Sequence, residues 1–171
     1  MPAPLIRDET PNDLDAIREV NRRAFGGEAE ARLVDRLRDD GLVVASLVAI
    51  EGERIAGHIL FSDLPIKTEY GVIPAAALAP VAVVPERQRA GIGSALVQRG
   101  LETCRERGRT AVVVLGHPTY YPRFGFSAGL ARTIHSPYSG AGEAFMALEL
   151  TPGALASGGV ARYPAAFDMV D

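Results

Sequence analysis

Apolar and polar positions along the first half of the chain predict a strand, two helices and a β-hairpin. The apolar segment 5–7 predicts a short strand, and 10–25 and 29–40 carry apolar residues at helical spacing, each helix ending at glycine. From residue 43 the spacing changes to that of strands rich in β-branched residues. Segments 43–51 and 54–61 therefore predict a hairpin with a tight turn between them.

The second half continues this mixed pattern. Two segments, 75–84 and 111–115, are apolar throughout, as expected of strands that are covered on both faces. Between them a helix opens at Gly91, and a helical turn at 120–124 and a strand at 144–150 follow. The order of elements predicts the α/β class, with a mixed central sheet flanked by helices.

Pro80 lies inside the apolar strand 75–84. Proline has no N–H to donate to a ladder, so within sheets it is confined to edges, strand starts and bulges. We expect the strand to bulge or to part from a neighbour at Pro80. Backbone groups freed there would be available to something other than a strand.

Composition narrows the function classes. The 171 residues carry 18 basic and 21 acidic side chains, a formal net charge of −3, which argues against nucleic acid or an anionic membrane as a partner. One cysteine excludes an internal disulfide framework, and the three histidines stand far apart in sequence, so no metal site is expected. The chain has no signal-peptide pattern and no apolar run near the roughly 20 residues of a membrane span, so we expect a cytoplasmic protein.

The loop after the strand 75–84 places two glycines where the next helix begins. The first N–H groups of a helix have no partner within it, and Gly91-Ile92-Gly93 lets an anion such as phosphate approach them closely. A P-loop is disfavoured because Ser94-Ala95 replaces its Lys-Ser/Thr, and a dinucleotide fingerprint is disfavoured because Leu96 replaces its third glycine. The alternative is that the glycines only ease the turn from strand to helix.

The residues around these glycines resemble the pyrophosphate-binding signature Q/R-x-x-G-x-G/A of the GNAT superfamily of N-acetyltransferases. The matching run is Gln88-Arg89-Ala90-Gly91-Ile92-Gly93, after a strand that ends Val81-Ala82-Val83-Val84-Pro85. The family's order of elements also agrees with the predicted order over about residues 3–150. The resemblance implies a single GNAT-type domain over 1–171, with 151–171 as a tail that Tyr163 and Phe167 anchor.

The resemblance implies acetyl-CoA as the acyl-donor substrate and assigns residues to its binding. In the family the strand before the signature parts from its neighbour and pairs with the pantetheine arm, and the loop amides hold the pyrophosphate. The implied pantetheine residues are Val81, Ala82 and Val83. The implied pyrophosphate residues are Gln88, Arg89, Ala90, Gly91, Ile92, Gly93 and Ser94.

A second match follows the strand 111–115. Tyr121 stands four residues before Gly125-Phe126, which resembles the family's Y-x-x-x-G-F ending, where the tyrosine lies beside the CoA sulfur. A phenol keeps its proton at pH 7 and can donate to a departing thiolate, so we expect Tyr121 to be the general acid and to contact the cofactor. The alternative is that Tyr120 and Tyr121 both pack under the sheet, and we assign Tyr120 to the core or the cleft wall.

The sequence differs from the better-known family pattern at the position of the general base. Many members carry a glutamate on the strand before the signature, but residues 75–80 contain no carboxylate. His58, on the neighbouring hairpin strand, is our candidate base because an imidazole can accept a proton near neutral pH. A hydrogen-bonded structural histidine is the alternative. Glu28 and Glu30 are expected to be a solvated helix start.

Three further reactive side chains have alternative roles. His117, just past the strand 111–115, is a candidate cofactor contact or a cap on the strand end. Cys104 is expected in the core, with an acyl-cysteine intermediate as the alternative. His135 is expected on an exposed loop, with the substrate entrance as the alternative.

Together these features predict an acetyl-CoA-dependent N-acetyltransferase in which a primary amine of a small molecule, a peptide or a protein attacks the thioester directly in a ternary complex. The alternatives are a non-catalytic acyl-CoA sensor and a transferase for a longer acyl group. Residues 85–109 contain six arginines and three glutamates, a local charge of +3, so the rest carries −6. This balance suits the phosphates of CoA and a cationic amine acceptor. A homodimer is expected from the resemblance alone.

Overall fold

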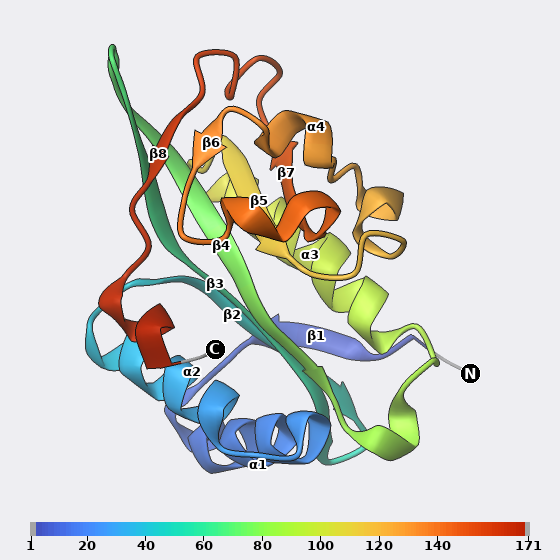
Figure 1. The fold of residues 1–171 in the computed structure, drawn as a ribbon. Helices are drawn as coiled ribbons and strands as arrows, with labels where there is room; N and C mark the ends of the chain where they lie inside the picture. The colour runs from blue at the N-terminus through green and yellow to red at the C-terminus, as the bar shows by residue number, and fades with distance from the viewer. Residues whose placement is uncertain (1–2, 170–171) are drawn as a thin grey trace.

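The computed structural model of the chain, which describes residues 3–169, contains one twisted mixed sheet with helices on both faces (Figure 1). Its main path runs in the order β1-β2-β3-β4-β5-β7, and only β4 and β5 are parallel neighbours on that path. This confirms the predicted α/β class. The strands on this path are β1 (Leu5–Asp8), β2 (Val43–Glu51), β3 (Arg54–Thr68), β4 (Gly71–Val83), β5 (Ala111–Leu115) and β7 (Phe145–Glu149).

The long helices lie on opposite faces of the sheet. Alternating side chains of β3 point in opposite directions: Phe61 joins the core under α3 (Ile92–Glu106), and Leu60 joins the core under α1 (Leu14–Phe25) and α2 (Ala29–Asp39). Gly100 lets α3 approach closely, because a Cβ there would lie 2.2 Å from a carbon of the Phe61 ring. The sheet therefore separates the body of α3 from the α1–α2 side.

The hairpin of β3 and β4 is longer than predicted. Pairing continues past residue 61 to Thr68↔Gly71, and Pro65 faces Pro74 within it. The predicted strand 54–61 was too short because Asp63, Pro65 and Lys67 interrupt the apolar pattern. In Figure 1 this hairpin projects beyond the body of the molecule.

The tail predicted to be irregular contains ordered elements. Its strand β8 (Gly159–Ala161) pairs with β3 and with β6 (Ile134–His135), and the 3-10 helix η5 (Ala165–Met169) lies against α2. Figure 1 shows this red segment beside α2, on the α1–α2 side of the sheet. The remaining short elements are η1 (Pro11–Asp13), η2 (Pro85–Arg87), η3 (Tyr121–Phe124), α4 (Ala128–Ala131) and η4 (Ser139–Ala144).

Phe167 is buried in this tail, as expected of an anchor, and Tyr163 is half-buried beside it. Across residues 3–169 no helix combines the length and the apolar character needed to cross a membrane.

Candidate active site

The sheet opens between β4 and β5. These parallel strands pair from Ala75↔Ala111 to Leu78↔Val114, and their pairing ends there although β4 continues to Val83. On the other side of β4 the register with β3 shifts at the same level, and the Ala79–Pro80 peptide bond is cis. The predictions that the strand bulges and parts from a neighbour at Pro80 are both confirmed.

The opening leaves backbone groups of β4 facing the gap. The Val84 N–H donates to the Ala56 carbonyl of β3 at 3.0 Å, so by alternation Ala82 also directs its backbone groups toward β3. Val81 and Val83 then direct theirs toward the gap, and the Gln88 amide donates to the Val83 carbonyl at 2.9 Å. The free groups nearest the opening are therefore those of Val81 and the N–H of Val83, not those of Ala82.

The N-terminus of α3 lies just after this edge of β4. The Ala95 N–H donates to the Gly91 carbonyl at 3.0 Å, which is the first bond of the helix, so the N–H groups of Ile92, Gly93 and Ser94 have no partner within it. Arg89 and Gly91 have φ values of 64° and 88°, a left-handed conformation that glycine adopts readily. A left-handed turn followed by N–H groups without helical partners is the arrangement that anion sites use.

Ion pairs connect the loop before α3 to α1 and to the end of β2. Arg87 donates to both carboxylate oxygens of Glu51 at 2.6 and 2.7 Å, and Arg23 of α1 donates to Glu86 at 2.5 Å. The positive charge of residues 85–109 is less concentrated around the loop than the sequence indicates. Two of its arginines, Arg107 and Arg109, pair with Asp8 and Asp63. They lie at the far end of a 15-residue helix, about 22 Å from its N-terminus.

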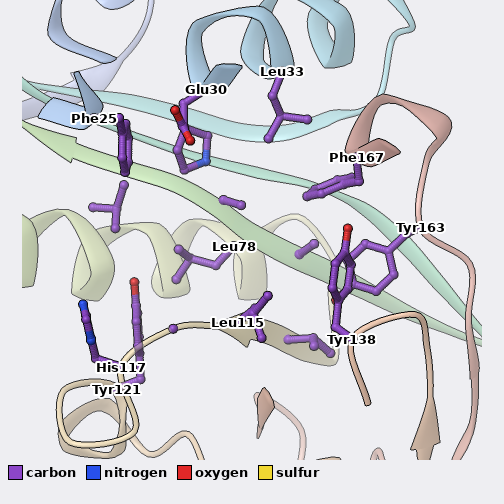
Figure 2. A pocket seen from close by; sticks show the side chains of 16 residues that line it. Phe25, Glu30, Leu33, Leu78, Leu115, His117, Tyr121, Tyr138, Tyr163 and Phe167 are labelled. Carbon is purple, nitrogen blue, oxygen red and sulfur yellow. The ribbon is translucent and has the colours of Figure 1, made fainter. Parts of the chain in front are cut away.

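A cavity of about 420 Å³ lies at the opening, on the side of α1 and α2 (Figure 2). This volume is within the range typical of small-molecule sites. Its walls come from β4, β5, the first two helices, the loops after β5 and β6, and the tail. The lining residues are Phe25, Glu30, Leu33, Ala77, Leu78, Ala79, Pro80, Val81, Val113, Leu115, Gly116, His117, Tyr121, Tyr138, Tyr163 and Phe167.

Tyr121 lies on the cavity wall, with its hydroxyl directed into the cavity in Figure 2. Its ring packs edge-to-face on Tyr120 and Phe126, with centroids 5.0 and 5.7 Å apart. Gly116 packs closely against the Tyr121 ring, since a Cβ at this position would lie 2.4 Å from a carbon of the ring. Burial raises the pKa of Tyr121 to about 12, so the hydroxyl keeps its proton at neutral pH.

Tyr120 links this wall to the amides of α3. Its hydroxyl lies 3.0 Å from Ser94 Oγ, and the Arg123 guanidinium stacks over its ring at 4.4 Å from the centroid. His117 is exposed and lines the same cavity, and Figure 2 shows its imidazole beside Tyr121. The structure thus brings His117, Tyr121 and Val81 together, with the α3 amides nearby.

His58 lies apart from this group. It is fully buried between the sheet and α1, where Asn21 Nδ2 is 3.2 Å from its Nδ1 and Ser46 Oγ is 2.8 Å from its Nε2. Ser46 also bonds the Glu9 carboxylate, which can only accept, so Ser46 accepts from Nε2–H and Asn21 donates to Nδ1. Burial lowers the pKa of His58 to about 4.

The placement of His58 does not fit the hypothesis that it is the base. It does not line the cavity, both ring nitrogens have partners, and a group with a pKa of about 4 is a weak proton acceptor at neutral pH. The structural alternative fits its contacts. Sequence spacing placed His58 on the correct strand but could not show that its side chain points to α1.

Glu30 differs from its expected place at a solvated helix start. It is half-buried and lines the cavity, and Figure 2 shows its carboxylate on the α2 side of β4. Glu28 is exposed and pairs with Arg22 at 2.9 Å, as expected of a solvated residue.

The other two reactive side chains do not line the cavity. Cys104 is buried in the core under α3, and burial raises the pKa of its thiol to about 12, so it is not a poised nucleophile. His135 is exposed on β6.

Comparison with known proteins identifies the family. The acetyltransferase (GNAT) domain model matches residues 5–129. The chain is 36% identical over 152 residues to the N-acetyltransferase YhbS of Escherichia coli K12, covering 88% of this chain and 90% of that protein. It is 44% identical over 117 residues to the N-acetyltransferase YjhQ of the same strain, covering 67% of this chain and 65% of that one.

Solved structures agree with these relatives. The crystal structure of Escherichia coli YhbS in complex with CoA matches with a TM-score of 0.90 and 33% identity, covering 99% of this chain and 94% of that one. A GNAT acetyltransferase from Brucella melitensis in complex with acetyl-CoA matches with a TM-score of 0.79 and 35% identity, covering 96% and 97%. The chain therefore belongs to the GNAT family and is an N-acetyltransferase.

Proposed function

We propose that the protein transfers the acetyl group of acetyl-CoA to a primary amine by direct attack in a ternary complex. The observation that carries this proposal is the gap between β4 and β5, which joins the free amides of α3 to a cavity that Tyr121 lines. CoA and acetyl-CoA in the complexes of the two similar structures support the same donor.

The donor would lie along the open edge of β4. The N–H groups of residues 89–94 would hold the pyrophosphate, with the α3 dipole favouring the anion. Val81 and Val83 would pair with the pantetheine amides, because their backbone groups face the gap. The thioester would then reach the cavity, where the Val81 N–H would polarise the acetyl carbonyl.

The chemistry needs proton movements that Tyr121 can assist. The nitrogen lone pair forms a bond to the acetyl carbon, the carbonyl becomes an oxyanion, and collapse of this intermediate breaks the C–S bond. The Tyr121 hydroxyl would donate to the departing sulfur. This donation leaves a phenolate, and because the pKa of Tyr121 is about 12, the phenolate takes up the proton that the positively charged nitrogen of the intermediate loses as the amide forms.

Two measurements on the intact protein test this proposal. Isothermal titration with acetyl-CoA and CoA should show binding, and incubation with acetyl-CoA and amines should yield CoA thiol and N-acetylated product by mass spectrometry. Binding without product for any amine would favour the sensor function. Faster transfer from longer acyl-CoAs would favour a transferase for a longer acyl group, and absent CoA binding would contradict all three.

The predicted cytoplasmic location and homodimer stay predictions. They are independent of the chemistry above, because the cavity and the free amides belong to one chain.

A further inference from the structure

The wall of the cavity opposite Tyr121 has a chemistry of its own. It is built by the start of α2, the end of α1, the loop after β6 and the tail (Figure 2). Five of its six side chains are apolar or aromatic, and one is a carboxylate. They are Phe25, Glu30, Leu33, Tyr138, Tyr163 and Phe167.

Three aromatic rings close one end of the cavity. Tyr138 and Tyr163 meet edge-to-face with centroids 4.8 Å apart, and Tyr163 meets Phe167 in the same way at 5.2 Å. Such contacts hold each ring in place. Phe167 belongs to η5, which lies against α2, so the end of the cavity is an aromatic surface held in place by packing.

Glu30 is the acidic residue of α2 that lines the cavity, whereas Asp39, which likewise has no ion pair among residues 3–169, is exposed and lies outside it. Asp35 pairs with Arg18 and with Arg38, whereas Glu30 has no ion-pair partner within residues 3–169. No other acidic side chain, and no lysine or arginine, is among the described residues that line the cavity. A carboxylate on the wall of a cavity that carries no other charged side chain among its described lining residues attracts a cation, and the attraction grows stronger when a bound ligand excludes water from the pair.

These two features occur in one cavity, on the side away from α3. We propose that the acceptor is a small primary amine carried on an apolar, preferably aromatic body, as in an arylalkylamine; this rests on the proposed function. Its ammonium group pairs with Glu30 while its ring packs against Tyr138, Tyr163 and Phe167. After the ammonium releases one proton to solvent, the neutral nitrogen attacks the thioester.

The same walls disfavour other amines. An amino sugar would place its hydroxyl groups against aromatic faces, and the polar side-chain groups in the lining, which are the hydroxyls of Tyr121, Tyr138 and Tyr163, His117 and Glu30, are too few to pair with all of them. A polyamine would bring additional positive charges, and Glu30 is the one carboxylate among the described lining residues to receive them. Discrimination therefore comes from unpaired polar groups as well as from apolar contact.

Steady-state acetylation of an amine panel by the intact protein tests the proposal. The panel contains phenethylamine, butylamine, glucosamine, spermidine and a lysine-containing peptide. We expect kcat/KM for phenethylamine to exceed that for glucosamine, spermidine and the peptide by at least roughly tenfold, as a few unpaired polar groups predict. Glu30→Gln should lower kcat/KM for phenethylamine at least tenfold, mainly through KM, with the Kd for acetyl-CoA unchanged.

Glu28→Gln is the matched control. It removes the same charge two residues away, but its carboxylate pairs with Arg22 outside the cavity, so phenethylamine kinetics should stay as in the wild type. Phe167→Leu keeps an apolar side chain and should raise KM for phenethylamine several-fold more than KM for butylamine.

The outcomes separate this inference from the function on which it rests. Highest kcat/KM for glucosamine, spermidine or the peptide, or equal effects of Glu30→Gln and Glu28→Gln, would overturn the acceptor class and leave N-acetylation standing. Acetyl-CoA binding with no acetylation of any amine in the panel would also overturn the proposed acceptor class. Failure to bind acetyl-CoA would instead overturn the proposed function.

Discussion

At the scale of single residues, Tyr121 and His58 show how burial gives two titratable groups different roles. Burial disfavours the charged form of each group, so it raises the pKa of the Tyr121 phenol and lowers the pKa of the His58 imidazole. For Tyr121 the neutral form is the proton donor that the reaction needs. For His58 it is a hydrogen-bonded part of the core.

Replacing Tyr121 by Phe tests the proposed acid. The ring contacts with Tyr120 and Phe126 do not need the hydroxyl, so the fold and the Kd for acetyl-CoA should change little. We expect kcat to fall by about 10²-fold or more, as for loss of a general acid. Tyr120→Phe is the neighbouring control, and full kcat in Tyr121→Phe across the pH range would show that the acid assignment is wrong.

The buried His58 makes stability depend on pH. Its pKa is about 4 in the folded state and near the ordinary 6.5 when unfolded, so the unfolded chain binds more protons between these values. The free energy of unfolding is therefore highest above pH 6.5 and declines as the pH falls toward 4. This linkage predicts a loss of about 2 kcal/mol between pH 7 and pH 5.

Urea unfolding of the wild type and of His58→Gln at both pH values measures this loss. The variant should lose less stability between pH 7 and pH 5, whereas His135→Gln, at an exposed position, should behave as the wild type. His58→Gln should also keep its acetylation rate, and a large drop in kcat in a folded variant would restore His58 as a base.

At the scale of elements, the ends of α3 offer a matched test of the pyrophosphate site. Gly91 before the helix and Gly108 after it have φ values of 88° and 82°, and neither position has an atom within 4 Å of an added Cβ. Alanine at either position therefore carries similar backbone strain, of about 1–2 kcal/mol. Only Gly91→Ala distorts the amides that would hold phosphate.

Calorimetric titration of both variants with acetyl-CoA separates strain from binding. We expect Gly91→Ala to weaken binding at least roughly tenfold, the effect of losing one charge-assisted hydrogen bond, and Gly108→Ala to bind as the wild type. Equal affinities in the two variants would place the pyrophosphate elsewhere.

Most of the elements that build the donor site could be predicted from the chain. Pro80 within an apolar strand indicated where β4 would leave β5, and the glycines at 91 and 93 indicated the start of α3. These signals work because proline and glycine act through backbone geometry, which is local. The directions of the backbone groups in β4 could not be predicted, because they depend on the register with β3. Those of Val81 and Val83 face the gap, and those of Ala82 face β3.

The acceptor side could not be predicted because its residues meet only through tertiary packing. Glu30, Tyr138 and Phe167 are far apart in sequence and follow no motif. The tail had too many glycines and prolines to predict β8 or η5, which depend on the edge of β3 and on α2. Its aromatic residues were the one available signal, and they indicated anchoring rather than a cavity wall.

At the scale of the whole molecule, we propose that the two substrates approach the gap between β4 and β5 from different sides of the sheet. Acetyl-CoA is proposed to bind at the N-terminus of α3 and pass through the gap beside β4. The amine is proposed to bind on the face that α1, α2 and the tail cover. The two meet at Tyr121, where β5 has parted from β4.

A crystal structure of this protein with CoA tests that arrangement most directly. We expect the pyrophosphate on the N–H groups of residues 89–94, the pantetheine paired with Val81 and Val83, and the sulfur within hydrogen-bond reach of the Tyr121 hydroxyl. A CoA molecule bound outside the gap, or a sulfur atom directed away from Tyr121, would contradict it.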